Sequence, residues 1–189
     1  MYTNLIARSV HDLTAAAWFG GSLMGAIGLN GATAEAKDPR ERTRLSTAGW
    51  MRWAPVQTGA FAAHLASLAP ILWKNKGRYA GQDAVMRWTW VKAGVTLAGA
   101  GVTLYSSILG KKVDELAEQG AEGATEPSAT ASPELQSAQQ QLRVLQWIIP
   151  VFAGTVIILG AKHGEMQRPE NVKLGLLKSL PFIGSKSGR

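Results

Sequence analysis

The chain has 189 residues, no cysteine and a formal net charge of +7, and its charged fraction of 17% is low for a soluble domain. This length suits one domain with at most a short tail. The lack of cysteine excludes a disulfide framework, an iron–sulfur cluster, a thiolate zinc site and a cysteine nucleophile. A basic chain often binds nucleic acid, so the placement of the charges has to be considered next.

The charges leave four long windows that contain no Asp, Glu, Lys or Arg. These windows are Leu13–Ala34, Trp53–Trp73, Ala93–Gly110 and Val144–Ala161. As helices they would be about 27–33 Å long, which matches a hydrocarbon core of about 30 Å. A soluble bundle is the alternative, but its buried helices rarely stay uncharged on every face for five turns. The sequence therefore predicts an all-α, four-helix transmembrane bundle within residues 1–168, with spans at about 10–32, 52–73, 90–110 and 143–162.

The basic residues flank these spans on both sides instead of forming one surface for nucleic acid. Four spans place both termini on the same side, and that side carries more Lys and Arg, so the positive-inside rule favours cytoplasmic termini. Tryptophans gather near the span ends, as expected for residues at headgroup level. They are Trp50, Trp53, Trp73, Trp88, Trp90 and Trp147, and the Ala- and Gly-rich composition is similar to that of bacterial plasma-membrane proteins.

Two segments lie outside the predicted spans. Residues 111–132 are rich in small residues and acids, so we expect a flexible loop, followed by a helix with Ser132 as N-cap and Pro133 as its first residue. Pro150 within that last helix suggests a kink. Residues 169–189 interleave apolar residues with lysines, which is typical of a tail that lies on the membrane surface or docks on a partner; a flexible basic tail without fixed structure is the alternative.

Small residues on two spans predict close helix packing, because helices in lipid gain stability when their backbones approach. In the first span they fall on one face at steps of three and four, and the third span offers a similar set. The predicted packing residues are Ala17, Gly21, Gly25, Gly28, Gly94, Ala98 and Gly101. The same glycines would also leave room for a flat cofactor or a lipid, an alternative that the spacing leaves open.

A few ionisable residues lie in or beside the spans, where such groups are candidates for function. His11, His64, Lys92 and His163 are the candidate cofactor ligands, and they all fall in the half of the membrane near the termini. Two neutral imidazoles on facing helices could bind haem iron, so haem b is the candidate cofactor; His and Asp could also pass protons or bind copper or zinc. The plainer alternative is that His64 makes an ordinary interhelical hydrogen bond, that Lys92 reaches the headgroups, and that His11 and His163 are interface residues.

The first span carries a short pattern, His11, six residues, Trp18, one residue, then Gly20 and Gly21. This pattern resembles the opening helix of the copper-resistance D-type membrane proteins and of the oxygen-independent protoporphyrinogen oxidases. For the oxidase family, the resemblance implies haem binding by a His of the first helix and a later Lys, here His11 and Lys92. That family continues with a Leu-Pro-Arg-Leu-type run where this chain has Ala26-Ile27-Gly28-Leu29-Asn30, which argues against the oxidase activity.

Three functions remain in view. The sequence most favours a non-enzymatic accessory subunit of a larger membrane complex, with the lipid bilayer, other membrane subunits or further copies of the chain as partners. It has no Walker loop, dinucleotide fingerprint, nucleophile elbow or paired-His zinc motif. The second function is a haem-binding or redox protein that uses His11 and His64. The third is a small transporter or copper-handling protein, which the lack of Cys and of Met-x-x-Met pairs disfavours.

Overall fold

The computed structural model describes residues 2–81 and 83–166, with side chains from residue 5 to 74 and from 84 to 166. The described chain is all-helical and contains four long helices and no strand. In order, the helices are α1 (Tyr2–Met24), a π-helix (Gly25–Leu29), α2 (Asn30–Ala34), α3 (Pro39–Gly81), α4 (Asp83–Glu115), a 3-10 turn (Ala117–Gln119) and α5 (Pro133–Met166). The predicted all-α class is thereby confirmed. The predicted tail, residues 169–189, lies outside the described residues.

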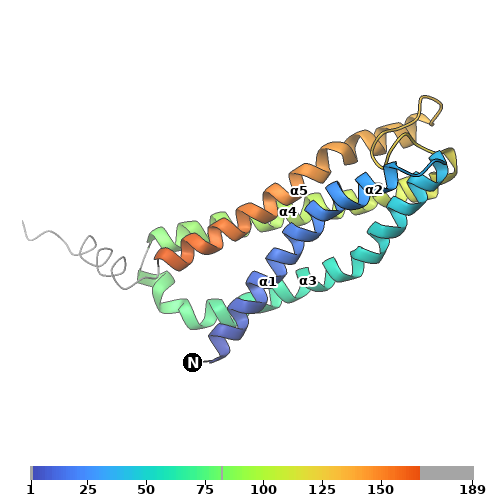
Figure 1. The fold of residues 1–189 in the computed structure, drawn as a ribbon. Helices are drawn as coiled ribbons and strands as arrows, with labels where there is room; N and C mark the ends of the chain where they lie inside the picture. Colours follow the sequence, from blue (N-terminus) through green and yellow to red (C-terminus); the bar gives the residue numbers. More distant parts are fainter. Residues whose placement is uncertain (1, 82, 167–189) are drawn as a thin grey trace, which may run out of the picture.

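The four long helices form an elongated bundle with two unlike ends (Figure 1). Helix α1 packs against α3 and α5, and α4 packs against α5 and α3. At one end, which we call the terminal end, α1 begins, α3 meets α4, and α5 finishes. At the other end, the loop end, short α2 leads into α3, and the connection from α4 to α5 lies beside it. Figure 1 also shows the α1–α3 pair diverging from the α4–α5 pair toward the terminal end.

The middle of the bundle is packed around one buried tryptophan. Trp18 of α1 is 3% exposed and lies in a cluster with Ala15, Ile149, Ala153 and Val156. Its indole Nε1 donates to the Thr103 hydroxyl at 3.2 Å, so the polar edge of the ring is satisfied inside the core. Pro150 is buried in the same region, and α5 continues through it as one helix.

Gly21 of α1 and Gly25 of the π-helix accept tryptophan rings from α3. A Cβ on Gly21 would lie 2.0 Å from the Trp53 ring, and one on Gly25 would lie 2.1 Å from the Trp50 ring. The predicted packing face of α1 is therefore used, although the partner is a flat side chain and not a backbone. Both rings turn inward against these glycines and not outward, while the predicted headgroup level of Trp50 and Trp53 stays a prediction. Trp73 and Trp90 are 74% and 70% exposed, as that expectation requires.

The remaining predicted packing residues give a mixed result. Ala17 and Gly28 are half-buried, and a Cβ on Gly28 would meet only the side chain of Met24. On α4 the predicted face is wrong for packing inside this bundle, because Gly94, Ala98 and Gly101 are all exposed. The packed glycine of α4 is Gly99, where a Cβ would lie 2.5 Å from the Trp18 ring. The spacing of small residues identified the helix, but the orientation of α4 decides which glycine is buried.

The connection between α4 and α5 folds over the loop end, where the sequence predicted a flexible loop. In this cap, residues 116–132, Ala121 is fully buried, and its N–H donates to the Pro39 carbonyl at 3.1 Å. The fully buried Gln139 of α5 donates to the carbonyls of Gly123 and Ala124 at 3.3 and 3.2 Å. Small side chains, which favour disorder in an isolated segment, here allow the backbone to lie close against the helices.

The start of α5 matches its prediction. The Leu135 N–H donates to the Ser132 hydroxyl at 3.3 Å, and Pro133 is the first helical residue. A side-chain oxygen at the N-cap satisfies an amide that the helix leaves without a partner. This cap fixes where the connection ends and where the last long helix begins.

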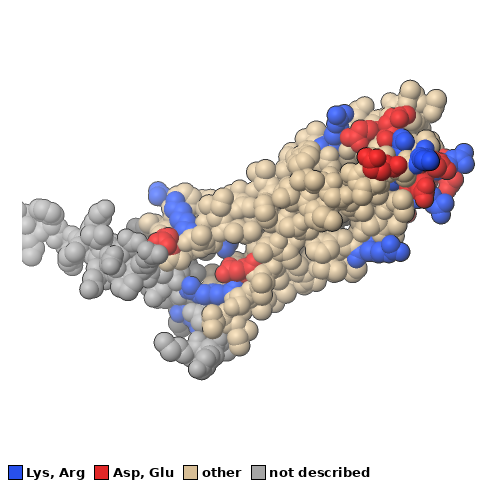
Figure 2. Space-filling model, in the orientation of Figure 1, with Lys and Arg blue, Asp and Glu red and all other residues tan. Residues whose placement is uncertain are grey.

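Charged side chains gather at the two ends of the bundle, and uncharged residues cover most of the surface between them (Figure 2). Two of the long helices, over residues 84–115 and 133–166, are long and apolar enough to cross a membrane. The described parts of α1 and α3 are less apolar, although each contains a charge-free window. The coarse prediction of apolar, membrane-type helices is thus supported for α4 and α5.

Candidate functional site

Three of the four predicted ligand residues meet near the terminal end. His11 of α1 and His64 of α3 are 6% and 4% exposed, and their rings stack with centroids 3.8 Å apart and an interplanar angle of 24°. The partly buried Lys92 of α4 places its Nζ 2.9 Å from His11 Nε2. Residues 81 positions apart in the sequence are thereby in direct contact, and three helices contribute to one polar cluster.

Two hydroxyl groups that the sequence did not single out complete this cluster. The Ser67 hydroxyl donates to the His64 carbonyl at 2.6 Å and lies 3.2 Å from His11 Nδ1. Thr14 lies 3.1 Å from His64 Nδ1. Both residues were detectable in principle, because each lies three positions after a candidate histidine and so shares its helix face. Because serine and threonine are common in helices, this spacing alone does not identify them as members of a site.

The hydrogen bonds fix the protonation pattern of His11. The Ser67 hydroxyl gives its proton to the His64 carbonyl, so it accepts from His11, and Nδ1 of His11 must carry hydrogen. If Lys92 is charged, its Nζ only donates, and His11 Nε2 is then the acceptor of this bond. In that state, His11 is a neutral imidazole, with its proton on Nδ1 and its lone pair directed at the ammonium.

His64 is fixed in a similar way. Its Nδ1 lies 3.1 Å from the backbone carbonyl of His11, which can only accept, so this nitrogen carries hydrogen. The two stacked rings are thus both bonded through Nδ1, one to a hydroxyl and one to a carbonyl. Because the two rings lie face to face, their nitrogens do not point toward one common position where an ion could sit.

The space for the Lys92 ammonium comes from a glycine on the neighbouring helix. A Cβ on Gly160 of α5 would lie 3.3 Å from Lys92 Nζ, closer than most real side-chain contacts. Lys92 therefore extends from α4 between α1 and α5. Asp12 is exposed on α1, and its carboxylate interacts electrostatically with Lys92.

His163, the fourth predicted ligand, is set apart from the stacked pair. It lies on α5 one turn after Gly160, half-buried, and close enough to interact electrostatically with Lys92. Its buried Nε2 has no hydrogen-bond partner within the described chain. Nearby, Lys162 Nζ lies 3.2 Å above the Trp88 ring, a cation–π contact that joins α5 to α4. His163 thus borders the cluster without joining its hydrogen bonds.

Within the described residues, no group of three or more His, Asp or Glu side chains is arranged to hold a metal ion. Comparisons with protein-family models, with curated proteins and with solved structures find no match for this chain. The function has to be argued from the cluster itself and from the surface that surrounds it.

Proposed function

We propose that the chain is an integral membrane protein in which all four long helices cross the bilayer, with both termini on the cytoplasmic side. Large apolar side chains on every long helix support this proposal, because they are exposed along the middle of the bundle. Phe19, Leu65, Leu97 and Val151 are 36%, 51%, 67% and 68% exposed, one from each helix. Lipid would cover these side chains, whereas water would leave a large apolar surface uncovered.

The lower hydropathy of α1 and α3 fits the same proposal. Their polar side chains face one another inside the bundle, as the burial of His11, Ser22, His64 and Ser67 shows. Polar residues in membrane helices are favoured on such interior faces, where they find partners. Within their charge-free windows, α1 and α3 therefore turn large apolar side chains such as Phe19 and Leu65 outward.

Within the membrane, we infer a non-enzymatic role as a subunit of a larger complex. The exposed face of α4 supports this role, since Gly94, Ala98 and Gly101 would let the backbone of another helix approach closely. A bulky residue at this face should prevent assembly without disturbing the bundle. Ala98→Trp should release the chain from its complex in mild detergent, whereas Ala62→Trp, at an exposed position on α3, should not. Equal assembly of both variants would contradict the subunit role.

The working element of this subunit is the Lys92–His11 pair, which we propose binds and releases one proton. The single observation that carries this proposal is the 2.9 Å contact between Lys92 Nζ and His11 Nε2. One proton shared by the pair gives one positive charge between α4 and α1. A second proton would place two positive charges in contact in a medium of low dielectric, which is strongly unfavourable. The pair therefore has two accessible states, one with the shared proton and one without it. Because the charge of the pair differs between these states, the electrostatic force between the α1–α3 pair and the α4–α5 pair differs too.

Nitrogen NMR of histidine-labelled protein in bilayers tests this proposal. We expect His11 to be neutral, with hydrogen on Nδ1 and an accepting Nε2. Lys92→Met should shift the Nε2 signal, because the donor is lost. Lys162→Met should leave the signal in place, since that lysine stacks on Trp88 instead. A doubly protonated His11 in the wild-type protein would contradict the one-proton site. Equal shifts of the Nε2 signal in Lys92→Met and Lys162→Met would contradict it as well.

Haem binding by His11 is a second candidate function, because the contact with Lys92 joins the two residues that the family resemblance implies as ligands. The observed geometry does not fit haem as it stands. Lys92 Nζ and His11 Nε2 bond each other directly at 2.9 Å, which leaves no space for a metal ion between the two nitrogens. The stacked His11 and His64 rings likewise cannot direct nitrogens at each other across a porphyrin. An absorption spectrum of protein purified from native membranes decides, since bound haem gives a Soret band.

A further inference from the structure

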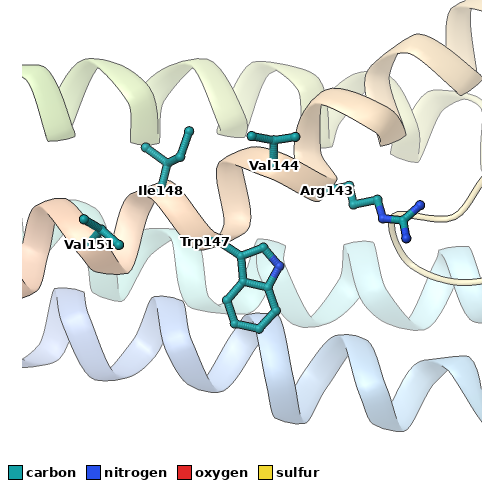
Figure 3. A pocket seen from close by; sticks show the side chains of 5 residues that line it. All are labelled: Arg143, Val144, Trp147, Ile148 and Val151. Atoms are coloured by element: carbon teal, nitrogen blue, oxygen red, sulfur yellow. The ribbon is translucent and has the colours of Figure 1, made fainter.

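A groove runs along the outer surface of α5 near the loop end (Figure 3). Its volume is about 510 Å³, within the range of small-molecule sites. Val144 and Ile148 lie along one side of the helix, and Trp147 and Val151 lie along the other. Each pair is four residues apart, so each forms one row of side chains parallel to the helix axis. The two rows border a shallow, open, apolar groove on the surface of α5.

One end of this groove carries a positive charge. Arg143 completes the lining, and in Figure 3 its side chain extends away from the four apolar residues. The Arg143 side chain is 65% exposed, and Glu126 of the cap is its ion-pair partner, with Nε and Oε1 3.9 Å apart. This separation is too long for a hydrogen bond, so most guanidinium donors remain available to a ligand.

The groove also has a fixed orientation relative to the bundle. Arg143 is the last charged residue before the window Val144–Ala161, so it marks the boundary of the apolar surface at the loop end. From Arg143 to Val151 the helix rises about 12 Å into that apolar surface. A ligand in the groove would thus have an anionic group at one end and a hydrocarbon chain directed along the membrane normal.

We propose that this groove binds one anionic phospholipid, with its phosphate on Arg143 and one acyl chain between the two rows of α5. Charge complementarity and the apolar walls select this class of molecule. Guanidinium groups bind phosphate oxygens with two donors at once, and an anionic headgroup adds charge attraction at the membrane surface. This inference rests on the membrane location proposed above, and it assigns to the loop end a partner that the proton site does not involve.

Native mass spectrometry of the delipidated full chain in detergent tests the groove, with phosphatidylglycerol and phosphatidylcholine of identical chains as probes. We expect phosphatidylglycerol to bind with at least tenfold higher affinity, and Arg143→Gln to remove that preference. Arg52→Gln is the matched control, because Arg52 is an exposed basic residue on α3 beside another charge-free window. Glu126→Gln should raise the affinity severalfold, since it removes the competing carboxylate.

A second variant tests the apolar part of the site. Val144→Trp fills the groove at an exposed position, so it should weaken binding of both lipids while the bundle stays folded. Equal affinities for the two lipids, or equal losses in Arg143→Gln and Arg52→Gln, would overturn the proposal. Displacement of bound lipid by millimolar inorganic phosphate would also overturn it, because the site would then be one for free anions.

Extraction of native membranes with carbonate separates this proposal from the one on which it rests. Protein that stays in the membrane fraction but shows no lipid preference overturns the groove alone. Release of the wild-type protein by carbonate overturns the membrane location itself.

Discussion

The two ends of the bundle are joined by different chemistry. At the loop end, Asn30 follows the π-helix, and its Oδ1 accepts from the Ser46 hydroxyl at 3.1 Å and from Trp50 Nε1 at 3.0 Å. Its Nδ2 donates to Gln146 of α5 at 2.9 Å. At the terminal end, the corresponding contacts among α1, α3 and α4 use His11, a second histidine and a lysine.

This difference separates hydrogen bonds between groups that do not titrate from the contacts that we propose as a proton site. Amide, hydroxyl and indole groups do not titrate near neutral pH, so the bonds around Asn30 are permanent. Imidazole and ammonium groups change charge, so the contacts around His11 depend on their protonation state. The helix pairs also diverge toward the terminal end (Figure 1). We call the hydrogen bonds around Asn30 the fixed joint, and if the proposed proton site is correct, movement linked to protons is expected at the other end.

The largest expected effect comes from breaking the fixed joint. Asn30→Ala leaves Trp50, Ser46 and Gln146 without their shared partner, and a polar group left unsatisfied in a buried position costs about 1–3 kcal/mol. We expect a loss of about 3 kcal/mol in the free energy of unfolding, which lowers the thermal midpoint by about 6–12 °C. Thermal unfolding in detergent measures this shift. Gln140→Ala, at an exposed position on α5, is the control, and a similar shift there would show that the joint is not special.

A smaller loss in the free energy of unfolding should follow from filling the space that a glycine near this joint leaves for a tryptophan ring. In Gly25→Ala, the new Cβ would lie 2.1 Å from a Trp50 ring that its bond to Asn30 holds in place. Overpacking of this kind costs about 1–3 kcal/mol, so we expect a loss of about 2 kcal/mol. Gly20→Ala introduces a Cβ with nothing within 4 Å and should not destabilise the protein. If both variants unfold at the same temperature, the ring does not fill that space.

At the terminal end, a single hydroxyl should matter less. Ser67→Ala removes the acceptor of His11 Nδ1, and we expect a loss of about 1 kcal/mol. The matched change is Ser106→Ala, because the buried Ser106 hydroxyl has no hydrogen-bond partner within the described chain and should lose nothing. Chemical denaturation in mixed micelles compares the two. A proton on Nε2 of His11 in the Ser67→Ala protein, seen by nitrogen NMR, would further identify this hydroxyl as the group that sets the tautomer.

The smallest effect is expected from ion pairs at the surface of the loop end. Lys112 and Glu134 form such a pair, with side chains 42% and 57% exposed. Pairs this exposed contribute about 0–1 kcal/mol and are screened by salt. Glu134→Gln should therefore change the unfolding free energy by less than about 0.5 kcal/mol, in low and in high salt alike. A loss comparable to that of Asn30→Ala would mean that charge, and not neutral hydrogen bonding, secures this end.

Part of the architecture was accessible from the sequence. Charge-free windows gave the four long helices, because an uninterrupted apolar run of that length forms a helix in almost any setting. The N-cap at Ser132 was visible for a similar reason, since capping depends on residues within one turn. The grouping of His11, His64 and Lys92 near one end followed from their positions along helices of known rise.

Other features depended on how the helices face one another. The burial of Gly99 in place of Gly94 and Gly101 is set by the rotation of α4 about its axis. The sequence does not specify that rotation, because small residues occur on several faces of this helix. The inward turn of Trp50 and Trp53 depends on glycines in another helix. The folded cap depends on buried amides such as Gln139 that lie outside the loop itself.

By itself, the sequence determined the number of long helices and which ionisable groups lie near the terminal end, because these properties follow from local pattern and helix rise; α3, α4 and α5 extend well beyond the predicted spans. The tertiary structure alone decided that His11 and His64 stack and that Lys92 donates to His11, since those contacts join residues of three helices. It likewise decided that the opposite end is locked by neutral hydrogen bonds around Asn30. Contacts between distant residues arise only when each helix takes its rotation and depth, and packing sets both.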